Sequence, residues 1–534
     1  MNNDVPLRDG RTWLSYSMLA PLAICVIYIH LCLPYIIDDA YITFAYSKNL
    51  HELGALVFRQ GNNVAATSSF AWATLLGLLS NFAWNPVIWS KVLGAACYIS
   101  TIFVVITLLH NRTTPSLSGV LTAIATALPF GFALWSNYGM ENGLLGLMCF
   151  ATALTLPKQQ KIFIYLISPL LLLGICITRP EGFGYAMAAW SAEFTRRWIV
   201  NEDKTTALNT LIIAVALFGV FEFFYYQHFG VLLPDSATSK IQAPLKEKIQ
   251  NGWIYLKDPA NLYVIWIAPV AIGFQIWELI FSAIDPREER HAPALIGGAL
   301  TIAALTFSLL SGGDWMPAAR FLAFALPFCA GYIAWGLHRH LPDTYKLPAT
   351  GFYVIVLLGT QIAATTTHLD FVKKLQDGTD SAVITMIDEL NRTAREEDVI
   401  ALSDIGYASY AFKGDVFDWW GLASRPVREK GESLGRIRSE TIRAENPEYL
   451  VVYSNTSLPP QSVSQFDGAE SMSKGIVSDA HLMARYCLLK NYYFWAGRYH
   501  ALMARRDHAA EAESTLRSVF PAHKGTCFAP AVNK

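Results

Sequence analysis

Apolar residues gather in long runs that recur from residue 15 to residue 367 and then stop. A helix needs about 20 apolar residues to cross the hydrocarbon core of a bilayer. Eleven runs approach or reach that length, at 15–37, 87–109, 117–134, 143–157, 161–178, 183–195, 207–229, 260–283, 293–311, 319–337 and 348–367. The pattern predicts a polytopic α-helical membrane domain at residues 1–367, followed by a soluble domain at residues 368–534.

One further apolar run, Ala65 to Phe82, is not counted as a span. The polar segment Arg59-Gln-Gly-Asn-Asn63 precedes it, Thr67-Ser-Ser69 lies near its start, and its far end carries no basic residue. These features are typical of a helix that lies in the membrane interface. Counting it as a span would also invert every later loop, which would place the basic clusters outside the cell.

Basic residues then fall in short loops on one side of the predicted membrane domain. They lie before the first run and after the second, fourth, sixth, eighth and tenth: Arg8, Arg11, Arg112, Lys158, Lys161, Arg196, Arg197, Lys204, Arg287, Arg290, Arg339 and Lys346. Loops rich in Lys and Arg stay cytoplasmic. We therefore expect a cytoplasmic N-terminus, and the odd number of spans places the soluble domain on the outer side.

Composition agrees with this division of the chain. Hydrophobic residues make up 53% and charged residues 16%, whereas soluble domains carry about 25% charged residues. The net charge of −1 and the lack of a dense basic stripe exclude nucleic acid as an expected partner. The first run, Trp13 to Ile37, is too long for a typical signal-peptide core and is read as an uncleaved span.

Six of the eight cysteines lie in apolar runs, where a thiol behaves as a small hydrophobic group. Cys487 and Cys527 fall in the soluble domain. These two could form a disulfide if that domain lies in an oxidising compartment.

The unusual polar residues of the membrane domain all fall in loops predicted to face outward. They form five clusters: Asp38-Asp39, Glu141 within Tyr138-Gly-Met-Glu-Asn142, Arg179-Pro-Glu-Gly182, Pro234-Asp-Ser-Ala-Thr-Ser-Lys240, and Gly312-Gly-Asp-Trp-Met-Pro-Ala-Ala-Arg320. Charged groups at membrane depth are costly unless they line a cavity. Five loops that meet on one face therefore predict a functional site.

The residue types in these loops suit a particular chemistry. A carboxylate can take a proton from an attacking hydroxyl, and Asp38 and Asp39 are the candidate catalytic bases, with a slight preference for Asp38. Arg179, Lys240 and Arg320 could bind an anionic leaving group, and the planar fork of an arginine suits a phosphate.

Each cluster also has a purely structural interpretation when it is taken alone. The two aspartates could cap a helix end, and Arg179 and Glu181 could form a local ion pair at a turn. The segment Gly312 to Pro317 has the residues of a tight turn with an interfacial tryptophan. The coincidence of all five clusters on one face favours the functional interpretation.

At this point the sequence resembles the GT-C superfamily of membrane-embedded glycosyltransferases that use lipid-phosphate sugars. In particular it resembles the group that contains the mycobacterial terminal β-(1→2)-arabinofuranosyltransferase. The resembling stretches follow one another in family order: 38–50, Gly54-Ala-Leu-Val-Phe58, Thr67-Ser-Ser69, Gly139-Met-Glu141, Thr178-Arg-Pro-Glu-Gly182, Pro234-Asp-Ser236, Gly312-Gly-Asp-Trp-Met-Pro317, Arg320-Phe-Leu322 and Ser403-Asp-Ile-Gly406.

The resemblance implies an inverting transfer from a polyprenyl-phosphate sugar to a cell-envelope glycan, glycolipid or surface protein. Arabinofuranose is the sugar that the analogy indicates. It implies that the base is Asp38 or Asp39 and that the enzyme sits in the bacterial cytoplasmic membrane, with its site outside. It also implies amphipathic surface helices at Ala40 to Leu53 and at Ala65 to Phe82. Candidate substrate-binding residues from the same stretches are Tyr41, Glu141, Glu181, Asp235, Ser236, Asp314 and Trp315.

The sequence departs from the family at two places. Relatives more often carry Pro-Gly-Glu-Arg-Val-Glu-Gly where this chain has Arg59-Gln-Gly-Asn-Asn-Val-Ala-Ala66, and they commonly have an arginine where it has Ala45. Recognition of the sugar or of the acceptor is therefore expected to differ.

The soluble domain is predicted to be a small α/β domain. Strands are expected at Val399 to Leu402, Val416 to Trp419 and Leu450 to Tyr453, with helices at Thr379 to Arg395 and Ser433 to Ala444. No phosphate-loop or dinucleotide fingerprint is present, which argues against a nucleotide-sugar donor. The aromatic residues Trp419, Trp420 and Tyr492 to Trp495 could stack on glycan rings, but a core role is favoured.

Two other classes of protein stay open on the sequence alone. A lipid-linked sugar transporter or flippase could also carry outward Arg and Asp residues, although transporters gather such groups at the membrane midplane. A non-catalytic envelope scaffold could use the soluble domain to bind a partner. No cofactor is expected, and a divalent metal is left open because the aspartate pair lacks a second ligand set at a recognisable spacing.

Overall fold

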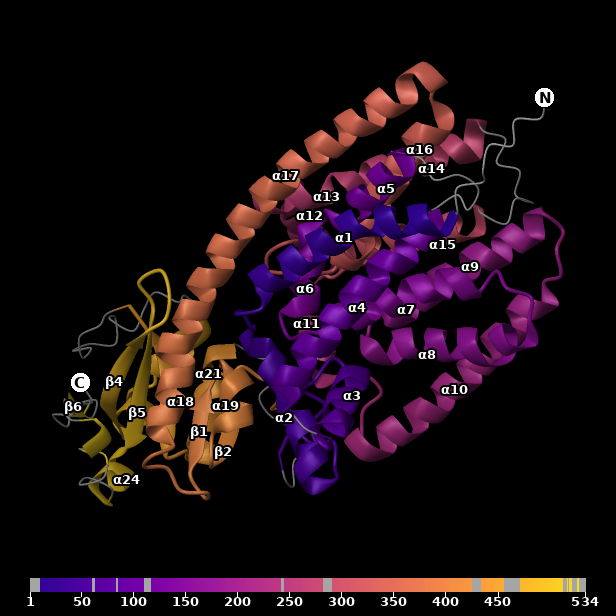
Figure 1. The fold of residues 1–534 in the computed structure, drawn as a ribbon. Helices are drawn as coiled ribbons and strands as arrows, with labels where there is room; N and C mark the ends of the chain where they lie inside the picture. The colour runs from indigo at the N-terminus through magenta and orange to yellow at the C-terminus, as the bar shows by residue number, and fades with distance from the viewer. Residues whose placement is uncertain are drawn as a thin grey trace, which may run out of the picture.

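The structure is a computed structural model of the chain and describes residues 10–59, 63–82, 85–109, 117–241, 244–281, 291–424, 434–455, 471–511, 516, 518–520 and 526–527. A large helical bundle occupies most of it, and a small sheet lies beside one end of this bundle (Figure 1). The sheet is formed by the C-terminal part of the chain, as the sequence predicts.

Every run that was predicted as a span is mostly helical in its described residues, although 33–37 and 319–322 are not helical. The bundle helices are α1 (Gly10–Cys32), α4 (Pro86–Leu109), α5 (Leu117–Ala127), α6 (Phe130–Asn137), α7 (Asn142–Thr155), η1 (Phe163–Ile167), α8 (Ser168–Thr178), α9 (Gly182–Ile199), α10 (Thr205–Phe229), α13 (Pro259–Ile265), α14 (Ile267–Phe281), α15 (His291–Leu310), η2 (Ala323–Ala325), α16 (Leu326–His340) and α17 (Asp343–Gly378).

The number of spans stays a prediction. Among the described residues, four helices are long and apolar enough to cross a membrane, and the bent pair α5 and α6 would make a fifth. Five further apolar helices are shorter, at 10–17 residues. Eleven crossings would therefore require several short helices to span, as the short apolar runs already implied.

The bend between α5 and α6 has a local cause. The two helices meet at 48° across Leu128 and Pro129, and proline cannot continue the hydrogen-bond ladder of a helix. The freed amide of Phe130 donates instead to Oε1 of Gln361 on α17, at 3.0 Å. The Gln361 side chain thus gives the amide of Phe130 a hydrogen-bond partner, which lipid could not provide.

Close helix packing around this bend depends on small residues. A Cβ atom added at Gly94 of α4 would lie 2.1 Å from the carbonyl oxygen of Ser136 on α6. Small residues let the backbones of membrane helices approach one another in this way. The packing of α4 against α6 supports the 138–141 turn, which belongs to one of the five outward loops.

Four further helices are short: α2 (Asp38–Leu53), α3 (Phe70–Ser80), α11 (Asp235–Ile241) and α12 (Leu245–Lys257). At 1.5 Å per residue, the 11 residues of α3 reach only about 16 Å, too little to cross a bilayer. Helix is thus present at residues 70–80 of the predicted 65–82, whereas residues 65–69 are extended; its place in the membrane interface stays a prediction. Residues 40–47 of α2 are all buried, so this helix lies between other elements.

The C-terminal part contains a six-stranded sheet in the order β2-β1-β3-β5-β4-β6. The first three strands run parallel and the last three run antiparallel. The strands are β1 (Val399–Leu402), β2 (Asp415–Asp418), β3 (Tyr449–Ser454), β4 (Tyr486–Tyr493), β5 (Tyr499–Arg505) and β6 (Thr526–Cys527). The helices around it are η3 (Thr379–Ile384), α18 (Thr385–Leu390), α19 (Ile405–Ala411), α21 (Leu434–Glu445), α22 (Ser471–Val477), α23 (Ala480–Met483) and α24 (Arg506–Glu511).

The expected division at residue 367 falls inside a helix. α17 continues through η3 into α18, so that one helical segment of 48 residues runs from Asp343 to Leu390. It leads from the far end of the bundle to the sheet (Figure 1). The predicted helix at Thr379 to Arg395 is thus the end of the last apolar helix, and the bundle and the sheet are joined without a linker.

Candidate active site

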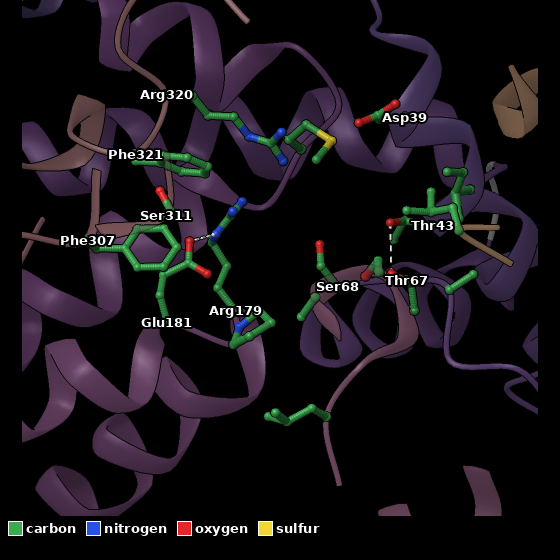
Figure 2. Close-up of a pocket in the computed structure, with 18 of the residues that line it drawn as sticks. Asp39, Thr43, Thr67, Ser68, Arg179, Glu181, Phe307, Ser311, Arg320 and Phe321 are labelled. Carbon is green, nitrogen blue, oxygen red and sulfur yellow. Dashed lines mark hydrogen bonds and ion pairs between the residues drawn. The ribbon is translucent and has the colours of Figure 1, made fainter. Parts of the chain in front are cut away.

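The five loops that were predicted to face outward meet around one cavity of about 400 Å³, whose wall includes Leu422 from the C-terminal part. The sequence brings each loop there at a helix boundary, where the chain turns between two packed helices. The cavity is lined by Asp39, Ile42, Thr43, Ala66, Thr67, Ser68, Met140, Arg179, Pro180, Glu181, Leu233, Ser236, Ala237, Lys248, Phe307, Leu310, Ser311, Gly313, Arg320, Phe321 and Leu422. Figure 2 shows that one carboxylate, Asp39, lies around the same space as Arg179 and Arg320.

The two adjacent aspartates at the start of α2 face different surroundings. Successive side chains diverge by about 100° around a helix. Asp39 lines the cavity. Asp38 accepts hydrogen bonds from the backbone amides of Gly406 and Tyr407, at 3.0 and 2.9 Å. The structure thus places Asp39 in the candidate site and Asp38 in the contact between α2 and α19, so the slight sequence preference for Asp38 has no support in this geometry.

The surroundings of Asp38 favour its protonated form. Loss of solvation, followed by the nearby carboxylate of Asp404, raises the pKa of Asp38 to about 7. The two backbone amides act in the opposite direction because they stabilise the charged form. Asp38 therefore titrates near neutral pH although it lies outside the cavity.

The two arginines of the cavity differ in how far their charge is neutralised. Arg179 pairs with Glu141 at 2.5 Å and also with Glu181. Arg320 lies 3.4 Å from Asp314, and its guanidinium rests 5.2 Å from the ring centre of Trp135. Its Nε is buried and has no hydrogen-bond partner among the described residues. Arg320 therefore has donor capacity left for an anion.

Hydroxyl groups line the part of the cavity between Asp39 and α3. The side chains of Thr43 and Thr67 are hydrogen-bonded at 3.0 Å, and Ser68 follows at once (Figure 2). The extended segment that carries them is fixed by Asp235, which accepts from the amide of Ala65 at 2.8 Å and donates its own amide to the carbonyl of Ala65. Asp235 therefore shapes the cavity without lining it.

A second cavity continues from the first toward the bundle. It measures about 620 Å³ and shares Thr67, Ser68, Arg179, Pro180 and Leu233 with the polar cavity. Its remaining wall is mostly apolar and includes Phe183, Val215, Phe218, Gly219, Phe221, Tyr225 and Phe229 from α9 and α10. The site thus joins a charged cavity to an apolar groove.

The structure separates the residues proposed from the sequence into two groups. Asp39, Arg179, Glu181, Ser236 and Arg320 line the cavity. Three others lie outside the lining but contact residues of the cavity wall or its neighbours, as described above: Glu141, Asp235 and Asp314. Tyr41 packs on Tyr407 at the contact with α19, with ring centres 5.1 Å apart, and Trp315 is exposed to solvent outside the lining.

Lys240 is the one proposed residue whose side chain lies outside the described residues. The cavity instead includes Lys248 from α12, which the sequence analysis did not single out. α12 has no long apolar run, and its register relative to the cavity depends on packing against α15. Five further lining residues were not proposed as site residues because none belongs to a charged cluster, although Thr43, Thr67 and Ser68 fall in the resembling stretches: Thr43, Thr67, Ser68, Ser311 and Leu422.

Outside this cavity, two other predictions concern the sheet. Trp419 and Tyr492 are core residues, as favoured, but Trp420 and Tyr493 are exposed. Cys487 is disulfide-bonded, and the backbone of Cys527 on β6 lies directly opposite it, as expected of a pair. No group of three metal-ligating side chains gathers anywhere in the described ranges, so a metal requirement stays open.

Comparisons with known proteins agree with this architecture. Residues 372–511 match the family described as "Domain of unknown function (DUF8728)". The chain is 25% identical over 278 residues to the terminal beta-(1->2)-arabinofuranosyltransferase of Mycobacterium tuberculosis, across 47% of this chain and 41% of that relative. The alignment thus spans less than half the length of the relative.

The structure is similar to the crystal structure of ArnT from Cupriavidus metallidurans in the apo state. The TM-score is 0.50 at 11% identity, and the match covers 92% of this chain and 98% of ArnT. At this identity the similarity shows the fold alone. The resemblance found in the sequence is confirmed at that level: this chain is a membrane protein with the fold of the GT-C glycosyltransferases.

Proposed function

We propose that the chain is an inverting glycosyltransferase that moves a sugar from a polyprenyl-phosphate donor to a hydroxyl of a cell-envelope glycan, glycolipid or surface protein. The observation that carries this proposal is the cavity itself, which is lined by Asp39, Arg179 and Arg320 and adjoins an apolar groove at Arg179. Each part of it matches one part of such a reaction.

The carboxylate of Asp39 supplies the base. It takes the proton from the acceptor hydroxyl while the hydroxyl oxygen forms a bond to the anomeric carbon of the donor. The bond between that carbon and the phosphate oxygen breaks, and the phosphate keeps the electron pair. Arg320, with Arg179 beside it, stabilises the negative charge that develops on this leaving group. Attack from the side opposite the phosphate inverts the anomeric centre.

The apolar groove supports a lipid-linked donor. The phosphate of such a donor needs cations while its prenyl chain needs an apolar surface, and the two cavities meet at Arg179 and Pro180. A nucleotide sugar would leave the groove empty. Arabinofuranose is the first sugar to test, because the Mycobacterium tuberculosis relative is named for arabinofuranosyl transfer.

The site is proposed to lie on the outer face of the bacterial cytoplasmic membrane. The basic residues Arg196 and Arg197 lie in the last turn of α9, a helix that runs away from the sheet (Figure 1). Positive loops stay cytoplasmic, which puts the cavity and the sheet outside. The disulfide at Cys487 supports the same orientation, since disulfides persist in oxidising compartments.

The test is transfer by purified full-length protein in lipid nanodiscs. Synthetic polyprenyl-phosphate arabinofuranose and a set of polyprenyl-phosphate hexoses serve as donors, and envelope oligosaccharides serve as acceptors. The product is analysed for the new glycosidic bond and its anomeric configuration. We expect a bond of inverted configuration with at least one donor.

The same preparation separates the competing classes of protein. A transporter would carry a lipid-linked sugar across the membrane of a sealed vesicle without forming a bond. A scaffold would do neither. A known transferase that is active under the same conditions serves as the control. If it is active, transport without a new glycosidic bond, or neither transport nor bond formation, would overturn the proposal.

A further inference from the structure

The sheet contributes one residue to the cavity, and it comes from the loop after β2. Leu422 lines the cavity together with Asp39, although the two are distant in the sequence. The loop lies in the segment 372–511, for whose family no function is stated. The C-terminal domain therefore forms part of the cavity wall.

This loop is held in a fixed shape by a buried carboxylate. Asp418, at the end of β2, accepts from the amide of Trp420 at 2.8 Å and from the amide of Ala423 at 2.6 Å. Gly421 between them adopts φ +93°, a conformation that side-chain-bearing residues rarely take. The loop is preorganised, so a ligand that binds it need not pay for ordering it.

Two neighbouring tryptophans in this loop have opposite environments. Trp419 is fully buried and its Nε1 donates to the carbonyl of Val451 at 3.1 Å. Trp420 is 40% exposed. The guanidinium of Arg438 lies 4.4 Å from the ring centre of Trp420 and fixes its orientation. Core packing explains Trp419, but it does not account for a large exposed indole on a rigid loop beside a polar cavity.

We propose that Trp420 and Leu422 form a saccharide-binding edge for the acceptor. The indole face of Trp420 stacks on a sugar ring of the acceptor, and Leu422 contacts the apolar C–H surface next to the reacting hydroxyl. Two residues of chain span at most about 7 Å, so the backbone that carries Trp420 lies close to the cavity wall at Leu422. This inference rests on the proposed function, because it assigns the acceptor of that same reaction.

The test uses full-length protein in nanodiscs and an immobilised array of bacterial envelope oligosaccharides. Trp420→Ala is compared with Trp420→Phe, which keeps an aromatic face, and with Trp198→Ala as the matched control. Trp198 on α9 is also exposed, at 64%, and carries a cation on its ring, Lys204 at 5.4 Å, but it does not line the cavity. Thermal unfolding of each variant shows that it is folded.

We expect Trp420→Ala to weaken glycan binding by about tenfold, a difference of about 1.4 kcal/mol. Trp420→Phe and Trp198→Ala should bind as the wild type does. In transfer assays, Trp420→Ala should raise the acceptor KM and leave the donor KM unchanged. Equal binding by Trp420→Ala and wild type, or no glycan binding by the wild type, would overturn the proposal.

The two proposals fail in different ways. If the wild type transfers sugar and Trp420→Ala has an unchanged acceptor KM, the saccharide-binding edge is wrong and the reaction stands. If the wild type binds glycans through Trp420 but transfers nothing, the reaction is wrong and the binding edge stands. A variant that binds neither glycan nor donor has lost its fold, and Trp420→Phe then decides the question.

Discussion

Asp38 and Asp39 are neighbours in the sequence, yet they belong to different parts of the molecule. Asp39 borders the cavity with Arg179 and Arg320, whereas Asp38 binds the first amides of α19. The sequence identifies the pair as unusual but cannot choose between them. The choice depends on a contact between residues 38 and 406, more than 360 positions apart, and no local pattern specifies such a contact.

Asp38 should make the stability of the protein depend on pH. Its pKa in the folded protein is raised from 3.8 to about 7, so the folded state holds a proton that the unfolded chain releases. The contribution of Asp38 is fully present below about pH 4 and is lost as the pH rises through about 7. Asp38→Asn does not titrate, so its Tm should change less between pH 5 and pH 8.

The measurement is thermal unfolding of both proteins across this range. Asp418 also has a raised pKa, about 6, but it is present in both proteins and its contribution cancels in the comparison. Parallel Tm curves for wild type and Asp38→Asn would show that Asp38 does not titrate as described.

Arg320 and Arg179 should respond differently to removal. Arg320 keeps a donor free for a phosphate, so Arg320→Ala should raise the donor KM by about 10- to 100-fold, as expected for a lost charge-assisted hydrogen bond. Arg179→Ala leaves the buried Glu141 unpaired, which costs about 3–5 kcal/mol of stability.

Steady-state kinetics and thermal unfolding of both variants distinguish these effects. The double variant Arg179→Ala with Glu141→Gln should recover part of the lost stability, because it removes the unpaired charge. An unchanged donor KM in Arg320→Ala would exclude that residue from phosphate binding.

At the scale of elements, the apolar runs predict most of the helices because each run must be buried or face lipid. The strands β1 and β3 also fall within a residue of the predicted ranges, since both are short runs of aliphatic residues. β4 and β5 were missed. Tyr486–Tyr493 and Tyr499–Arg505 mix charges and aromatic residues, and their pairing is set by their antiparallel partner.

The apolar pattern of the sequence also did not predict the short helices α11 and α12, which contribute residues to the site. α11 and α12 carry few apolar residues in a row, so hydropathy alone reads them as loop. Lys248 reaches the cavity only because α12 packs on α15. Periodicity predicts that a helix exists, but it does not predict where its partner lies.

The groove beside α10 should control which donors are accepted. Gly219 borders this groove and faces open space, so Gly219→Leu adds a side chain to it without a clash. We expect the donor KM to rise for long-chain polyprenyl-phosphate sugars and to stay unchanged for short-chain donors. Gly359→Leu on α17, where the glycine also faces open space, is the matched control.

Kinetics with two donor chain lengths measure this effect. Equal changes for both lengths, or an equal effect of Gly359→Leu, would show that the prenyl chain does not occupy the groove.

At the scale of the whole molecule, the bundle and the sheet form one site. α2 contacts α19 of the C-terminal part through Asp38, through Lys48, which donates to the carbonyl of Tyr410 at 3.2 Å, and through the packing of Tyr41 on Tyr407. Just before α2, the amide of Ile36 donates to Gln376 of α17 at 2.9 Å. The sequence predicts the membrane domain and the soluble domain separately. It does not predict that the two domains pack together beside Asp39.

The orientation across the membrane can be tested by labelling. Thr205 at the start of α10 and Lys413 beside the sheet are both exposed. A membrane-impermeant thiol reagent added to intact cells should label Lys413→Cys and leave Thr205→Cys unlabelled until the membrane is permeabilised. The reverse pattern would place the site and the sheet on the cytoplasmic side.

The most direct test of the account compares turnover by Asp39→Asn and Asp38→Asn in the same transfer assay, with donor binding and Tm measured for both. The account predicts that Asp39→Asn lowers kcat by about 10²- to 10⁴-fold, the usual contribution of a general base, while it still binds the donor. Asp38→Asn should keep kcat within about tenfold of the wild type, since its carboxylate lies outside the cavity. Loss of turnover in a folded Asp38→Asn together with an active Asp39→Asn would contradict the account.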